Sequence, residues 1–246
     1  MIFLRSLLFN VLCYSTGTLW GMLSVFCWLL PKRFRVLPMM WWLRFTLWHL
    51  RWICGIKVEV VTQFAGNLPT PAVIIARHQS TWETWFLQLY FAPLATILKR
   101  ELLFIPFFGW GLALFHPITI DRASRMQAVR QVREQGLCQL GAGKNVLVFP
   151  EGTRVPVGQR RPFARSGIDL AAAAGVPIIP VTHNAGNCWP SRSFLKYPGT
   201  ITVTIGKPID TTQCNSKVLI QQVQAWALAE GAQPSHEGIS ATTSAA

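Results

Sequence analysis

Residues 6 to 30 contain no charged side chain, and this run limits what the chain can fold into. A helix rises about 1.5 Å per residue, so the run could cross a hydrocarbon core about 30 Å thick. Polar residues such as Asn10 and Thr16 interrupt it, so shallow insertion stays open beside a transmembrane span. The run is too long for a signal peptide and has no Ala-x-Ala exit. Three of the four residues from 32 to 35 are basic, so the positive-inside rule predicts that the following chain is cytoplasmic.

Residues 36 to 56 form a second apolar segment, which is rich in tryptophan. Arg44 and Arg51 are its only charges, and because they lie seven positions apart they share one face of a helix. Indole and guanidinium groups both find partners among lipid headgroups, so this pattern favours an interfacial helix. We therefore predict a hydrophobic helical hairpin that attaches the protein to a membrane. The alternative is a hairpin that packs on the body of the protein as ordinary core.

The overall charge indicates an anionic phospholipid membrane as the partner. The 246 residues include 23 Lys or Arg against 10 Asp or Glu, and 51% of them are apolar. A disordered chain would be less apolar, and nucleic-acid binders with this excess usually carry dense basic runs, so we expect no nucleic-acid partner. Residues 1 to 60 hold seven basic residues and one acid, which are expected to face lipid headgroups. The six cysteines are scattered without metal-like spacing, which is typical of a reducing compartment.

From residue 57 the sequence alternates between short apolar runs and helical patterns. This alternation predicts an α/β fold with a mostly parallel, layered sheet flanked by helices. We expect three regions: membrane helices over 1–56, an α/β domain over 57–230 and a disordered tail over 231–246. The predicted strands cover 57–62, 72–76, 95–98, 117–120, 145–149, 178–181 and 200–205, and the predicted helices cover 81–91, 124–140, 166–174 and 216–230.

The first candidate for chemistry is the pair His78 and Glu83. A buried strand is predicted to lead into His78 and a helix to begin near Ser80, so the two side chains can converge across the turn. A carboxylate bonded to one imidazole nitrogen fixes the tautomer and leaves the other nitrogen free to take a proton from a hydroxyl. A purely structural His–Glu hydrogen bond is the simpler interpretation of the pair taken alone.

The segment FPEGTR, residues 149–154, follows a predicted strand at the sheet edge where open α/β folds bind ligands. There Gly152 allows close approach of the backbone, Thr153 can donate a hydrogen bond, and Arg154 offers a planar fork for phosphate. A plain turn with a surface arginine is the alternative for this segment, and solvated loop charges are the alternative for the basic residues named next. Basic residues near the ends of two other predicted strands could complete a phosphate cradle; these are Lys99 and Arg122.

Several common motifs are absent. The GAGK of residues 141–144 lacks the first glycine and the final Ser or Thr of a P-loop. The sequence has no G-x-S-x-G elbow and no H-E-x-x-H zinc motif. We therefore expect neither a metal nor a resident cofactor. His183 follows a predicted strand and could line a pocket, but the pattern assigns it no role.

Together and in this order, the motifs over residues 70–210 resemble those of the lysophosphatidate acyltransferase family, within the glycerolipid acyltransferases. The H-x4-D motif of that family corresponds to His78 and Glu83. Glu stands where the family usually has Asp and is one methylene longer, which bears on rate and fine specificity more than on reaction type. FPEGTR is present unchanged, and the remaining matches are Lys99–Leu102, Phe108–Arg122 and Val176–Val181.

The resemblance implies transfer of a fatty acyl group from a thioester, acyl-CoA or acyl carrier protein, to the sn-2 hydroxyl of lysophosphatidic acid, which forms phosphatidic acid. His78 would act as general base with Glu83 as its partner. A bacterial inner-membrane enzyme with a cytoplasmic catalytic domain is expected. A related acyltransferase acting on another lyso-lipid or on glycerol 3-phosphate is the nearer alternative, and a non-enzymatic protein that binds anionic lipid is the other. By the same resemblance the acceptor pocket would comprise Lys99, Arg122, Glu151, Gly152 and Arg154.

Overall fold

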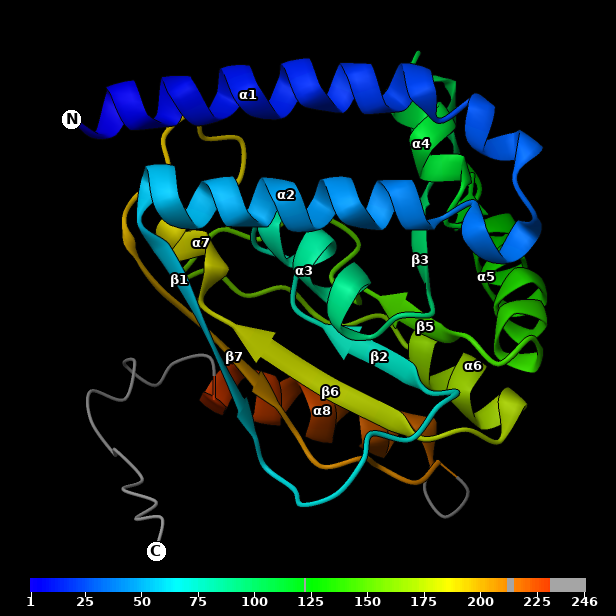
Figure 1. Cartoon of the computed structure of the whole chain (residues 1–246). Coiled ribbons are helices and arrows are strands. Elements are labelled where there is room, and N and C mark those ends of the chain that lie inside the picture. The colour runs from blue at the N-terminus through cyan, green and yellow to red at the C-terminus, as the bar shows by residue number, and fades with distance from the viewer. Residues whose placement is uncertain (122, 212–214, 231–246) are drawn as a thin grey trace, which may run out of the picture.

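The computed structural model describes residues 1–121, 123–211 and 215–230 (Figure 1). Arg122 and the predicted disordered tail at 231–246 lie outside the described residues. The strands are β1 (Ile56–Thr62), β2 (Val73–Ala76), β3 (Leu94–Lys99), β4 (Ile118–Ile120), β5 (Asn145–Val148), β6 (Ile178–His183) and β7 (Gly199–Ile205). The α-helices are α1 (Ile2–Leu23), α2 (Leu37–Cys54), α3 (Trp82–Tyr90), α4 (Phe108–Ala113), α5 (Arg125–Gly141), α6 (Ser166–Ala174), α7 (Ala185–Cys188) and α8 (Ser216–Glu230), with 3-10 turns at Phe26–Leu29, Lys32–Phe34 and Arg100–Phe104.

The strands form one sheet in the order β1-β7-β6-β2-β5-β3-β4. The strands from β6 to β4 in this order run parallel, whereas β7 is antiparallel to β6 and β1 is parallel to β7. The predicted α/β fold with a mostly parallel sheet is therefore confirmed, with one reversal between β6 and β7. Ile75 of β2 lies opposite Val148 of β5, and Ala76 lies opposite Val181 of β6. The carboxyl ends of three neighbouring strands thus meet at one edge, where ligands bind in such sheets.

Helices cover both faces of the sheet (Figure 1). Side chains of α1, α2 and α3 form the core on one face, and those of α5, α6 and α8 form the core on the other. Alternate residues of β2 enter the two cores: Ile74 and Ala76 face the first, and Val73 and Ile75 face the second. Because both faces are covered, β2 is apolar and buried along its whole length.

The hairpin predicted at the N-terminus is formed by α1 and α2, which lie side by side along the α3 face (Figure 1). One face of α1 is built for protein contact. Its Ser6 and Asn10 side chains are buried, and Thr16 Oγ1 accepts a hydrogen bond from Trp42 Nε1 of α2 at 3.2 Å. These polar residues, which interrupt the apolar run in the sequence, therefore face the protein and find partners there.

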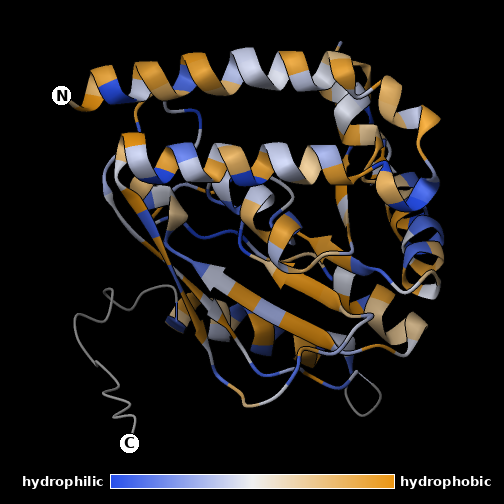
Figure 2. Ribbon diagram, viewed as in Figure 1, coloured by the Kyte–Doolittle hydropathy of each residue, from blue (hydrophilic) through white to orange (hydrophobic). Residues whose placement is uncertain are grey.

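The opposite face of α1 exposes apolar side chains. Residues 2–29 contain a window with a mean hydropathy of 1.3, of which 17% is buried, so this helix is long and apolar enough to cross a membrane. Figure 2 shows apolar residues along both helices of the hairpin. Such an extended exposed surface differs from ordinary core and is typical of a contact with membrane or partner. Its large exposed side chains include Phe3, Leu4, Leu8, Val11 and Tyr14 of α1 and Trp41, Phe45, Trp48 and Trp52 of α2.

Candidate active site

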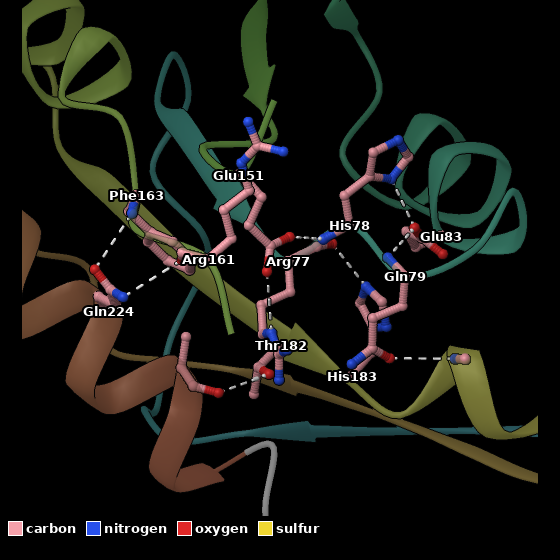
Figure 3. Close-up of polar contacts among 12 residues, drawn as sticks. Arg77, His78, Gln79, Glu83, Glu151, Arg161, Phe163, Thr182, His183 and Gln224 are labelled. Carbon is pink, nitrogen blue, oxygen red and sulfur yellow. Dashed lines mark hydrogen bonds and ion pairs between the residues drawn. The ribbon is translucent and has the colours of Figure 1, made fainter. Parts of the chain in front are cut away.

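The candidate site lies at the edge where β2, β5 and β6 end (Figure 3). His78 comes two residues after β2, Glu151 comes three residues after β5, and His183 is the last residue of β6. Because β5 and β6 flank β2, Glu151 and His183 approach the His78 segment from two neighbouring strands. Figure 3 shows residues 77–79 between Glu151 on one side and Glu83 on the other.

The turn that begins α3 directs Glu83 back onto His78. Glu83 Oε1 lies 2.8 Å from His78 Nδ1 and also accepts the backbone N–H groups of Gln79 at 2.9 Å and Ser80 at 2.7 Å. Ser80 Oγ in turn accepts the N–H of Trp82 at 3.2 Å. The Ser-x-x-Glu spacing and these reciprocal bonds resemble a capping box. The turn that precedes α3 and the contact with His78 therefore use the same carboxylate oxygen.

The hydrogen bonds define the tautomer of His78. Glu83 is fully buried, and burial alone raises its pKa; the hydrogen bond from His78, the nearby His183 and His78 rings, and the Ser80 amide lower it by more, so the pKa falls below its usual value. An ionised carboxylate can only accept, so His78 Nδ1 carries the hydrogen and Nε2 is left as an acceptor. The ring stacks on Phe149 at 4.1 Å, and its side chain is 17% exposed. An imidazole held this way can take a proton from a bound hydroxyl.

Glu151 supports the main chain of His78. Its Oε2 accepts the His78 N–H at 2.6 Å, and its Oε1 lies 3.5 Å from Arg77 Nε in a buried ion pair. The carbonyl of His78 accepts the Val155 N–H at 2.7 Å. Burial raises the pKa of Glu151 despite the opposing effects of the His78 amide and of Arg77. Both carboxylate oxygens thus contact the protein, and the role of Glu151 in binding substrate stays a prediction.

The other predicted site residues lie at the same edge of the sheet but are more open. Gly152 has φ +68° in a turn closed by its N–H to the Phe149 carbonyl at 3.0 Å. Thr153 is half-buried and Arg154 is exposed. Lys99 ends β3 and pairs with the exposed Glu101 at 3.0 Å. The predicted phosphate cradle stays a prediction, and its third basic member, Arg122, lies outside the described residues.

Sequence reasoning missed the role of His183. Its Nδ1 accepts the Ala185 N–H at 3.3 Å, so Nε2 carries the hydrogen and donates to the Arg77 carbonyl at 2.9 Å. The ring is 2% exposed. A histidine that ends a wholly buried strand was the available signal, but its importance depends on the pairing of β6 with β2. Among the described residues, no group of three or more His, Cys, Asp or Glu could hold a metal ion.

Gln79 was missed as well. Its Oε1 accepts the N–H of Gly186 in α7 at 3.2 Å. The residues on both sides of His78 are therefore held by neighbouring parts of the chain: His183 at the end of β6 binds the Arg77 carbonyl, and Gly186 of α7 binds the Gln79 side chain.

Known acyltransferases resemble this chain in both sequence and fold. A family model described as Acyltransferase matches residues 59–184. A 1-acyl-sn-glycerol-3-phosphate acyltransferase of Pseudomonas aeruginosa is 45% identical over 229 residues, which cover 91% of this chain and 88% of the relative. One from Saccharomyces cerevisiae is 31% identical over 85% of this chain and 69% of the relative. The crystal structure of the 1-acyl-sn-glycerophosphate (LPA) acyltransferase PlsC from Thermotoga maritima has the same fold, with a TM-score of 0.74 and 23% identity over 96% of this chain and 98% of that chain.

The family match spans about half of the chain and identifies the protein as an acyltransferase, and therefore as an enzyme. The chain is 45% identical to the Pseudomonas protein over 91% of its own length, so it belongs to the 1-acyl-sn-glycerol-3-phosphate acyltransferase family. The resemblance found in the motifs is thereby confirmed. The expectation of a merely lipid-binding protein is set aside.

The buried state of His183 predicts a pH-dependent stability. Burial, reinforced by the charges of Arg77 and His78, lowers the pKa of His183 despite the opposing Glu83 carboxylate and the hydrogen bond to Arg77. An unfolded histidine has a pKa of about 6.5, so below that pH the unfolded chain binds a proton that the folded chain does not. The free energy of unfolding should therefore fall as the pH is lowered from about 6.5 toward the folded pKa. Denaturant unfolding in detergent over this range measures the slope.

The substitution His183→Gln should make that slope shallower. Part of the slope should survive in His183→Gln, because burial and the charges of Lys144, Arg35 and Lys32 also lower the pKa of His116. An unaltered slope in His183→Gln would contradict the assignment of His183 as a buried neutral ring.

Proposed function

We propose that the protein transfers a fatty acyl group from an acyl thioester to the 2-hydroxyl of 1-acyl-sn-glycerol-3-phosphate, which forms phosphatidic acid. One observation carries the proposal: at the carboxyl edge of the central strand, His78 has its Nδ1 bound to a buried carboxylate, and its Nε2 has no hydrogen-bond partner among the described residues. Family membership supplies the substrate class, since the relatives are named for this acceptor.

In the proposed reaction, His78 Nε2 takes the proton of the acceptor hydroxyl as its oxygen attacks the thioester carbonyl. The tetrahedral intermediate then collapses, the carbon–sulfur bond breaks, and the departing thiolate takes the proton from the imidazolium. Glu83 holds the ring and stabilises the imidazolium between the two steps. Such general-base catalysis contributes about 10²–10⁴-fold, so substrate positioning must supply the rest. The thioester is already an activated acyl donor, so the proposal assigns no resident cofactor.

Recognition of the acceptor phosphate is assigned to the exposed basic residues at the strand ends. Arg154 follows β5 and Lys99 ends β3, and these strands are neighbours in the sheet. Arg154 enters none of the ion pairs among the described residues, so its guanidinium is available for phosphate. Arg122 is proposed to join them. Coenzyme A and acyl carrier protein both remain open as the carrier of the acyl group.

The hairpin is proposed to attach the enzyme in the plane of the membrane, at the cytoplasmic face of a bacterial inner membrane. Near its start, α1 is bound through Ser6 Oγ, which accepts the Lys196 N–H at 2.9 Å. Near its end, Gly21 approaches Phe107 so closely that a Cβ there would lie 2.5 Å from the carbonyl oxygen. A helix held to the catalytic body at both ends could not turn through the bilayer without losing these contacts.

The proposed role of Glu83 predicts a loss of turnover in Glu83→Gln. Gln keeps an oxygen for the Gln79 and Ser80 amides but cannot stabilise an imidazolium, so kcat should fall by about 10²–10⁴-fold. The exposed Glu59→Gln is the matched control and should keep wild-type kcat. The measurement is transfer of a labelled acyl group from acyl-CoA to 1-oleoyl lysophosphatidic acid. Turnover near the wild-type rate in Glu83→Gln would contradict the dyad.

The proposed phosphate contact predicts an effect of Arg154→Ala on KM. Loss of a charge-assisted hydrogen bond should raise KM for lysophosphatidic acid by about 10-fold or more, with a smaller change in kcat. Monoacylglycerol, which has no phosphate, should be a poor acceptor for both forms, and the exposed Arg133→Ala should behave as wild type. An unchanged KM for lysophosphatidic acid together with efficient use of another acceptor would favour the related acyltransferase.

In-plane attachment predicts that both ends of the protein stay on one side of the membrane. An epitope tag placed before Met1 should survive protease added to intact spheroplasts and should be cleaved after lysis. Cleavage of the tag in intact spheroplasts, with the catalytic domain protected, would show that α1 spans the bilayer and would contradict this arrangement.

A further inference from the structure

Lys196 is a buried cation in the segment that joins α7 to β7. It is 3% exposed, and its Nζ donates to Asn10 Oδ1 of α1 and to the Phe194 carbonyl, each at 2.8 Å. The same Nζ lies 4.7 Å from the centre of the Trp189 ring. Phe9 and Phe194 complete an aromatic cage at 5.7 Å. None of the ion pairs among the described residues includes Lys196.

A charged group is a costly way to fill an apolar cage. Burial opposes the charged form and lowers the pKa of Lys196. Methionine has similar length and would fill the same space without that cost. Buried polar groups are retained in some proteins because they select one arrangement among several of similar packing energy. A buried lysine in this cage is therefore better explained by selection of one packing arrangement than by a gain in stability.

The contacts of Lys196 fix the position of α1 on the catalytic body. Two more hydrogen bonds join the same elements: the Lys196 N–H to Ser6 Oγ at 2.9 Å and Asn10 Nδ2 to the Phe194 carbonyl at 3.1 Å. The neighbouring contacts are aromatic and less directional, such as Phe9 against Trp189 with ring centres 5.5 Å apart. The close contact of Gly21 with Phe107 holds the far end of α1. Near its start, the directional bonds around Lys196 oppose sliding and rotation more strongly than aromatic contact alone would.

The cage also contacts both supports of the His78 turn. Trp189 packs edge-on against Trp85 of α3 at 5.4 Å, and α3 carries Glu83. Trp189 directly follows α7, where Gly186 donates to Gln79 beside His78. The Trp189 indole thus connects the contact between Lys196 and α1 to α3 and α7, the two helices that bind the residues around His78.

We propose that Lys196 is a positioning residue: through Asn10 and Trp189 it fixes the register of α1 on the catalytic body and so aligns α3 and α7 around His78. The activity part of this claim rests on the proposed function; the packing part does not.

The test compares full-length Lys196→Met, Asn10→Leu and the double variant in phospholipid vesicles, with the exposed Lys217→Met as matched control. Both single variants should lose about 10-fold to 100-fold in kcat, as expected for misplaced reacting groups, with little change in KM for lysophosphatidic acid. Hydrogen exchange should become faster both in α1 and at residues 79–83. Because the two residues act as a pair, the double variant should be no slower than either single variant.

Thermal unfolding separates positioning from stability. In the double variant neither side chain leaves the other unpaired, although the Phe194 carbonyl loses both of its side-chain donors, so its Tm should be no lower than that of the less stable single variant while its kcat stays low. Should Lys196→Met fail to accumulate, Asn10→Leu tests the same contact from the side of α1.

Wild-type kcat in the single variants would overturn the proposal, as would additive losses or unchanged exchange in α1. If the wild-type protein transferred no acyl group, the proposed function would be refuted. The hydrogen-exchange measurement would then still decide whether Lys196 couples α1 to the His78 turn.

Discussion

Three N–H groups converge on a single oxygen of Glu83, and the arrangement of the site depends on that oxygen. It accepts from the His78 ring and from the amides of Gln79 and Ser80. Oε2 of the same carboxylate is buried and has no hydrogen-bond partner among the described residues. The hydrogen bonds that compensate for burying this charge therefore all go to Oε1, which closes the turn before α3 and orients the imidazole. Removal of the carboxylate group would disturb the turn and the imidazole together.

The sheet supplies the framework that makes this turn rigid. β2 is central and buried on both faces, and its two neighbours deliver Glu151 and His183 to the main chain around His78. α3 links this framework to the N-terminal hairpin, because Trp85 packs against Trp42 of α2 at 5.7 Å while Glu83 of the same helix faces the site. In the proposed function, lipid substrates would thus reach a base whose position is set by both the sheet and the hairpin.

Sequence patterns predicted the regular elements well because burial on both faces leaves a clear signal. Short apolar runs such as VIIA and NVLV are typical of strands buried on both faces of a layered sheet, and they form β2 and β5. The helices at 166–174 and 216–230 were predicted with their observed bounds. The short helices α4 and α7 were missed because six and four residues carry too little periodicity. The reversal between β6 and β7 was missed as well, since apolar runs carry no information on strand direction.

For the site, the order of motifs sufficed for His78 and Glu83 because both lie in one local turn. The support from Glu151 and His183 could not be predicted, since it depends on which strands neighbour β2.

The tautomer of His78 is the most direct test of the account. Selective ¹⁵N labelling of the five histidines, with the His78 signals assigned by their loss in His78→Gln, would report on both ring nitrogens. The spectrum should be recorded at about pH 8, where an ordinary imidazole is neutral. The account predicts a protonated Nδ1 and a bare Nε2. A protonated Nε2 in the substrate-free enzyme would contradict it, because that nitrogen could then accept no proton from the acceptor hydroxyl.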